Sequence, residues 1–125
     1  MNLIDLLKTQ ERTRENYWRN TDYFLSYRLR WRAQMVRHLF HLFPENSVLE
    51  LGSGSCQWTH ELSNAGRNRN PICAATLNKD LHEKNEEQDF SENIERIHLN
   101  DFPSKLSGRR FDFIVGYHLL TDENA

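Results

Sequence analysis

The stretch Val48-Leu49-Glu50-Leu51-Gly52-Ser53-Gly54-Ser55 decides the fold of this 125-residue chain. The residues from Ser47 to Leu51, at and just before its start, form a short β-prone run. The glycines that follow let the backbone turn sharply and approach a ligand without a clash from Cβ. Residues 57–62 then have a helical pattern, and the free N–H groups at the start of such a helix face the turn. The stretch therefore predicts a strand, a glycine turn and a helix that together form a ligand-binding corner.

Three common glycine motifs do not fit this corner. A dinucleotide fingerprint, G-x-G-x-x-G, requires glycine at the sixth position, where this chain has Gln57. A nucleotide-binding P-loop requires G-K-[ST], which is absent. Ser53 and Ser55 lie at the wrong offsets for the nucleophile elbow of a hydrolase. An oxidoreductase that uses a nicotinamide cofactor is therefore the weakest of the functions considered.

The sequence on either side of the corner predicts an α/β fold. Further β-prone runs occur at 72–77, 94–99 and 111–116, and helical patterns occur from Gln57 to near Gly66 and from Lys79 to Asp89. Strands that alternate with helices indicate βαβ units and a parallel sheet.

The first 44 residues predict two helices. The first starts at Leu3 and runs to about Trp18, and the second starts after a capping cluster at 20–22 and ends at Phe43-Pro44. One stripe on the second helix has helical spacing and is expected to pack into the core: Phe24, Tyr27, Trp31, Met35, His38 and Leu42. We accordingly divide the chain into a helical region at 1–44 and an α/β region at 45–125.

The corner resembles the first motif of class I S-adenosylmethionine-dependent methyltransferases, in which an acidic residue is followed by x-G-x-G-x-G. Glu50, Gly52 and Gly54 match this motif, and Cys56 stands where a third glycine is usual. Cys56 at a helix start would have a lowered pKa and could act as a nucleophile. Because no base is nominated nearby in sequence, a small residue tolerated in the loop is the preferred interpretation.

Two later pieces follow in the order of that family, so the resemblance extends over residues 48–117. Asn100-Asp101-Phe102-Pro103 looks like the segment whose aspartate contacts the adenine amino group, and residues 111–117 look like the fourth strand. The resemblance implies a Rossmann-like partial sheet with strand order 3-2-1-4 and S-adenosylmethionine as cofactor. It implies these cofactor-binding residues: Glu50, Gly52, Ser53, Gly54, Thr76, Asn78, Asp101, Phe102 and Gly116.

The resemblance also assigns roles to these residues. The glycine loop would carry the amino acid part of the cofactor, Asp101 the adenine amino group, and Phe102 would pack on the ring. Tyr117 and His118, just past the fourth strand, would lie near the transferred methyl group as catalytic residues; a surface histidine is an equal alternative for the latter.

One family feature is missing from the second strand. That strand normally ends in an acidic residue that holds both ribose hydroxyls, whereas this chain offers Thr76 or Asn78. Neither is a bidentate acceptor like a carboxylate. This departure favours a second function, that of a non-catalytic methyltransferase-like binding or interaction module.

The resemblance implies that the chain holds the first four of the seven strands of a family domain, which form its cofactor half. The fourth strand would form an exposed apolar edge. We expect a homodimer or strand exchange through residues 111–120, or that the chain is a piece of a longer protein. The expected function is methyl transfer to a small-molecule acceptor.

Composition and charge bear on the partners, location and metal content expected of the protein. Residues 1–44 hold eight Lys and Arg against four Asp and Glu, but arginines on the wet face of a helix explain this better than a nucleic acid partner. No apolar run approaches the ~18 residues of a membrane span. With two cysteines and no signal-peptide pattern at the start, a cytoplasmic location is expected. The pairs His38/His41 and Cys56/His60 are too few ligands for a zinc site.

Overall fold

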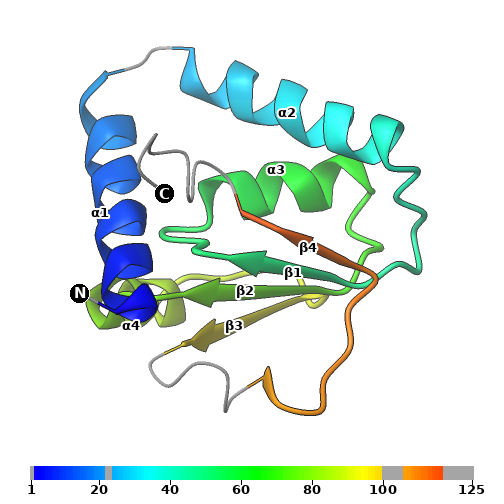
Figure 1. The fold of residues 1–125 in the computed structure, drawn as a ribbon. Helices are drawn as coiled ribbons and strands as arrows, with labels where there is room; N and C mark the ends of the chain where they lie inside the picture. Colours follow the sequence, from blue (N-terminus) through cyan, green and yellow to red (C-terminus); the bar gives the residue numbers. More distant parts are fainter. Residues whose placement is uncertain (1, 22–23, 100–105, 117–125) are drawn as a thin grey trace.

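Four parallel strands form a single sheet in the order β3-β2-β1-β4, and helices lie over it and across one edge (Figure 1). The computed structural model describes residues 2–21, 24–99 and 106–116. Its elements are α1 (Leu3–Thr21), α2 (Leu25–Leu39), β1 (Val48–Leu51), α3 (Gln57–Ala65), β2 (Ile72–Thr76), α4 (Lys79–Glu86), β3 (Ile94–His98) and β4 (Phe113–Val115). The predicted α/β class and the predicted strand order are both confirmed.

The register of the sheet brings the carboxyl ends of the strands to one edge. Val48 of β1 pairs with Ile72 of β2 on one side and with Phe113 of β4 on the other. All pairings are parallel. The order reverses between β1 and β4, which is where open α/β sheets form their ligand crevice. The residues that follow β1 and β2 therefore lie at the edge where function is expected.

One face of the sheet is covered by α2 and α3, which pack on each other (Figure 1). Residues of both helices and of all four strands contribute to this main core: Trp18, Leu25, Leu29, Ala33, Leu42, Val48, Cys56, Trp58, Leu62, Ile72, Ala74 and Ile94, with Phe113 and Val115 packed against it. The helical region at 1–44 and the sheet thus share one hydrophobic core.

The opposite face has a smaller core and is open at β4. Leu49, Cys73 and Ala75 pack there with Leu7 of α1 and with Phe111 from the segment before β4. Ile114 pairs with Leu49 and so lies on the same face, yet it is 68% exposed. The expectation of an exposed apolar edge at the fourth strand is confirmed for the described residues.

The predicted aromatic stripe of α2 is not the buried face of that helix. Leu25, Leu29 and Ala33 are buried instead, whereas Phe24, Tyr27 and Trp31 are 57–65% exposed. His38 is also exposed and Met35 is half-buried. The helix has apolar residues on two sides, and the small Ala33, fully buried, permits close approach to α3. Among the six residues of the stripe, Leu42 is the one that is buried, and it follows the helix rather than belonging to it.

The helix ends also differ from the prediction. The first helix continues to Thr21, and α2 ends at Leu39, before Phe43-Pro44. The chain leaves α2 through His41, whose φ is 52°, and the N–H of Leu42 donates to the carbonyl of Arg37 (3.0 Å). This is the bond pattern of a helix C-terminus closed by a left-handed residue. None of the helices in the described ranges is long and apolar enough to cross a bilayer.

Truncations on the two sides of α2 should lower the stability by unequal amounts. Leu29→Ala should lower the free energy of unfolding by about 2–5 kcal/mol because it leaves a cavity in the core. Trp31→Ala should lower it by less than about 1 kcal/mol, because the indole is largely exposed. Urea unfolding followed by circular dichroism measures both values. A larger loss for Trp31→Ala than for Leu29→Ala would show that the aromatic side of α2 is the buried one.

Candidate functional site

The glycine turn after β1 is held against β2 by backbone hydrogen bonds. The N–H groups of Gly52 and Ser53 both donate to the carbonyl of Ala75, at 2.8 and 3.1 Å. Gly52 and Gly54 have φ values of 75° and 57°, in the left-handed region that favours glycine. Cys56 has φ 66°, so the residue at the place of a third glycine also adopts a glycine-like backbone. The turn therefore has the backbone of a three-glycine loop with a cysteine at its last position.

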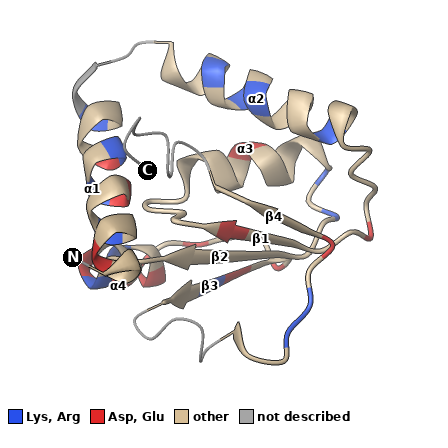
Figure 2. Ribbon diagram, viewed as in Figure 1, with Lys and Arg blue, Asp and Glu red and all other residues tan. Residues whose placement is uncertain are grey.

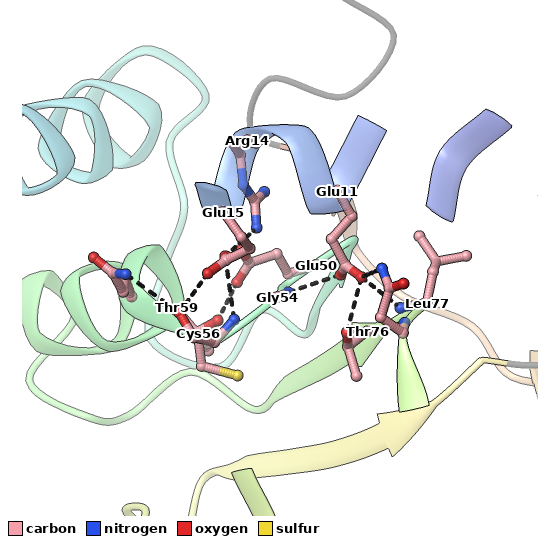
Figure 3. Close-up of polar contacts among 12 residues, drawn as sticks. Glu11, Arg14, Glu15, Glu50, Gly54, Cys56, Thr59, Thr76 and Leu77 are labelled. Atoms are coloured by element: carbon pink, nitrogen blue, oxygen red, sulfur yellow. Dashed lines mark hydrogen bonds and ion pairs between the residues drawn. The ribbon is translucent and has the colours of Figure 1, made fainter. Parts of the chain in front are cut away.

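Helix α1 crosses the edge of the sheet at which β1, β2 and β3 end (Figure 1). Its Glu11 side chain is fully buried between the glycine turn and the end of β2. Oε2 of Glu11 accepts from Gly54 N (2.8 Å), and Oε1 accepts from Thr76 Oγ1 (2.9 Å), Leu77 N (3.0 Å) and Asn78 Nδ2 (2.8 Å). One carboxylate thus joins the two loops that the sequence assigns to the cofactor (Figure 3).

Glu15, one turn further along α1, binds the next part of the glycine turn. Its oxygens accept from Ser55 N (3.2 Å) and Ser55 Oγ (2.7 Å), and Arg14 Nη2 donates to its Oε1 (2.9 Å). A Cβ on Gly54 would lie 2.0 Å from Oε1 of Glu15. The carboxylates of α1 therefore lie directly on the turn and leave no space for a side chain at that position.

The guanidinium of Arg14 is buried with these acids. Its side chain is 2% exposed, and its Cζ lies 4.4 Å from the ring centroid of Trp18. The salt bridge to Glu15 and the ring contact hold the positive charge of Arg14 beside three buried carboxyl groups, those of Glu11, Glu15 and Glu50. Figure 3 shows this cluster between α1 and the turn.

Glu50 at the end of β1 is the most perturbed acid of the cluster. Burial raises its pKa from 4.5 to about 7, and the negative charges of Glu11 and Glu15 add to the increase. A hydrogen bond from Thr59 and the charge of Arg14 oppose the increase in pKa. Oε1 accepts from Thr59 Oγ1, while Oε2 has no hydrogen-bond partner among the described residues. Near neutral pH the cluster therefore includes a carboxyl group that is partly protonated.

The predicted low pKa of Cys56 is wrong. Burial raises the pKa of this thiol to about 12, and the charges of Glu50 and Glu15 add to the increase. Asn85 of α4 holds the same loop from the other side, because its Nδ2 donates to the Gly54 carbonyl (2.9 Å) and contacts Cys56 Sγ (3.5 Å). Cys56 is consequently a structural residue of the loop and not a nucleophile.

Most predicted site residues of the described part converge on Glu11. Thr76, Asn78 and Gly54 donate to it directly, Gly52 and Ser53 belong to the same turn as Gly54, and Glu50 lies in β1 just before that turn. Gly116 directly follows β4, whose Val115 pairs with Glu50, and it is exposed. Four predicted residues lie outside the described residues: Asp101, Phe102, Tyr117 and His118.

The sequence contained a signal for the acids that were missed. Leu7 and Trp18 are buried on one side of α1, and helical spacing places three charged residues between them on the same side: Glu11, Arg14 and Glu15. Charged residues on the buried side of a helix are rare unless they have partners. The described residues contain no group of three or more His, Cys, Asp and Glu that is arranged to hold a metal ion.

One of the comparisons with known proteins supports the fold. No family model matches the chain, and no curated protein matches it significantly. Among solved structures, coclaurine N-methyltransferase bound to N-methylheliamine and SAH matches with a TM-score of 0.54 and 22% identity, over 67% of this chain and 25% of that one. YjhP from E. coli matches with a TM-score of 0.40 and 18% identity, over 53% of this chain and 28% of that one. The chain thus spans about a quarter of the length of these structures and shares the Rossmann-like fold of the first.

The raised pKa of Glu50 predicts how stability depends on pH. Between pH 4.5 and about 7 the folded protein holds a proton that the unfolded chain releases. The free energy of unfolding should therefore fall as pH rises through this window, by up to about 3 kcal/mol from this group. Glu50→Gln should remove that contribution, which urea unfolding at a series of pH values would measure. Glu45→Gln, at an exposed position, is the matched control; identical pH profiles for wild type and Glu50→Gln would contradict the assignment.

Proposed function

We propose that this chain is the cofactor-binding part of an S-adenosylmethionine-dependent methyltransferase. The observation that carries the proposal is the glycine turn at the end of β1, whose Gly54 and Ser55 N–H groups are already bonded to carboxylate oxygens. The amino acid part of S-adenosylmethionine also ends in a carboxylate, which these N–H groups could bind. The fold supports the proposal, because the structure it resembles is that of a methyltransferase with SAH bound.

The residues present fit the cofactor in their chemistry. Gly54 and Ser55 would donate N–H groups to its carboxylate, and Thr76 Oγ1 and Asn78 Nδ2 would turn to the ribose hydroxyls. Glu50 would hold the turn from beneath through Thr59. The cofactor supplies an activated methyl group, so the protein has mainly to align donor and acceptor.

The remaining site residues belong to this proposal through the family resemblance. Asp101 would contact the adenine amino group and Phe102 its ring, while Tyr117 and His118 would lie near the transferred methyl group. Gly116 supports the last assignment, since it follows β4 at the point where the strand order reverses. We propose a small-molecule acceptor and a cytoplasmic location.

A non-catalytic binding module is the second candidate function. Two observations favour it. Carboxylates of α1 lie on the glycine turn, and exposed aromatic side chains lie at the start of α2 (Phe24) and on it (Tyr27 and Trp31). Exposed aromatic residues of this size are common at protein interfaces. The two candidates differ in whether the turn accepts a nucleoside ligand at all.

Titration calorimetry with S-adenosylmethionine, SAH and NAD should separate the candidates. We expect heat with the first two ligands and none with NAD. Gly54→Asp should abolish binding, because the added side chain fills the turn. Gly108→Asp is the matched control, since Gly108 also has a positive φ (79°) but open space around it.

The outcome that contradicts the proposal is equally specific. An absence of heat with S-adenosylmethionine and SAH, in wild type and in a Glu11→Ala, Glu15→Ala double variant alike, would leave only the binding module. Unchanged affinity in Gly54→Asp would show that the ligand binds elsewhere.

We propose in addition that two copies associate through the strand at residues 111–120. The observation behind this is the free edge of β4 with Ile114 exposed beside it. Light scattering should find a dimer at high concentration, and Ile114→Glu should shift it to monomer by placing a charge in the contact. Leu3→Glu, at a site 55% exposed on α1, should leave the dimer intact. A wild-type protein that stays monomeric at every concentration would contradict this association.

A further inference from the structure

We propose that α1 is an intrachain competitor of the cofactor: Glu11 and Glu15 occupy the cofactor site, and α1 must leave the glycine turn before S-adenosylmethionine binds. This inference rests on the proposed function and adds a means of regulation to the same site. It concerns residues that lie outside the glycine motif and outside the part of the chain that resembles the family.

The burial and the hydrogen bonds of Glu11 keep a ligand away from its carboxylate. Oε1 accepts three hydrogen bonds and Oε2 accepts one. Glu11 already accepts four hydrogen bonds, from Gly54 N, Thr76 Oγ1, Leu77 N and Asn78 Nδ2. Its exposed fraction is 0%. In this arrangement Glu11 cannot also receive the ribose hydroxyls, and it holds the Thr76 and Asn78 groups that would otherwise reach them.

Glu15 closes the other half of the site. It accepts from Ser55 N, the second backbone donor of the turn, and it is 3% exposed. Its carboxylate comes so close to Gly54 that a single added Cβ would lie 2.0 Å from Oε1. A cofactor whose carboxylate is to reach both N–H groups has no path to them while Glu15 remains there. The turn therefore binds the carboxylates of α1 through the same backbone N–H groups that we propose for the carboxylate of the cofactor.

Contacts on either side of the two acids hold α1 in place. Leu7 and Trp18 are buried in the two cores, Arg12 forms a salt bridge with Asp80 of α4, and Asn78 Nδ2 donates to the Lys8 carbonyl (3.2 Å). The Arg12–Asp80 pair is exposed, and surface pairs of this kind contribute little, about 1 kcal/mol or less. The buried carboxylate contacts therefore dominate the polar hold on α1.

The charges of the cluster also favour the departure of α1 from the glycine turn. Glu11, Glu15 and Glu50 lie together around the guanidinium of Arg14, and the negative charges of Glu11 and Glu15 raise the pKa of Glu50. Helix α1 brings the acids Glu11 and Glu15 together with the cation Arg14 to the turn, a net charge of −1. S-adenosylmethionine would bring a carboxylate, an ammonium and a positive sulfonium, so replacement of α1 by the cofactor would reduce the negative charge beside Glu50.

The arrangement has a second interpretation with the opposite consequence. The Glu11 side chain, from α1, contacts the end of β2. At that end of the strand the family has its ribose-binding acid, whereas this chain has Thr76. If Glu11 supplied that missing carboxylate, its removal would weaken cofactor binding. The full burial of Glu11, and its hydrogen bonds to the Thr76 and Asn78 side chains, favour competition over supply.

Calorimetry with SAH on matched variants distinguishes competition by Glu11 from supply of the ribose-binding carboxylate. Glu11→Ala and Glu15→Ala should each bind SAH at least about tenfold more tightly than wild type, a change of about 1.4 kcal/mol. The double variant should bind more tightly still. Asp5→Ala is the matched control, because it removes an exposed acid of the same helix and should leave SAH affinity unchanged.

Amide hydrogen exchange of the wild-type protein provides a readout that needs no substitution. Saturating SAH should accelerate exchange over residues 3–21, because α1 leaves the turn when the ligand binds, and should slow exchange at Gly54 and Ser55. Equal or weaker SAH affinity in both single variants, or slower exchange over 3–21 with SAH, would overturn the competition while leaving the proposed function in place. If no variant binds SAH, the proposed function fails and the competition fails with it.

Discussion

The described structure of this site depends on the hydrogen bonds that the carboxylate of Glu11 accepts. This carboxylate connects three elements that are far apart in the sequence, because it lies on α1 and accepts hydrogen bonds from the turn after β1 and from the end of β2. An acid without partners in such a place would be strongly destabilising. The four donors around it make its burial tolerable and fix the helix across the carboxyl edge of the sheet (Figure 1). Figure 2 shows acidic residues on α1 at this edge, and Figure 3 shows Glu50 of β1 close to them. The architecture of the edge is thus set by polar contacts, whereas the two faces of the sheet are set by apolar packing.

The sequence predicted the sheet well because its signals are local. The glycine turn follows directly from Gly52 and Gly54, whose φ values are positive, and each predicted strand exists within a few residues of its expected bounds. Strand order came from the family resemblance and not from periodicity. The buried face of α2 was not predictable in the same way, because apolar residues occur on two of its sides and the packing of α2 with α3 buries the side with Leu25, Leu29 and Ala33. Its aromatic residues satisfied the helical period and are nevertheless exposed.

The polar half of the site was largely beyond sequence reasoning. Thr76, Asn78 and the glycine turn were identified, but the group that joins them is on a helix more than 40 residues upstream of the turn. No local pattern relates Glu11 to Gly54. The raised pKa of Cys56 has a similar origin: a helix start favours a thiolate, but burial beside Glu50 and Glu15 outweighs that effect. Both errors arise from tertiary burial, which changes the chemistry of a residue without changing its neighbours in sequence.

A structure determined with SAH bound tests the central claim most directly, through the distance between Glu11 and the backbone N–H of Leu77. That distance is 3.0 Å when α1 lies on the turn. Our account predicts that the bound ligand takes the Gly54 and Ser55 N–H groups and that Glu11 no longer accepts from Leu77. A complex in which SAH occupies the turn while Glu11 keeps its bonds to Gly54 and Leu77 would contradict it.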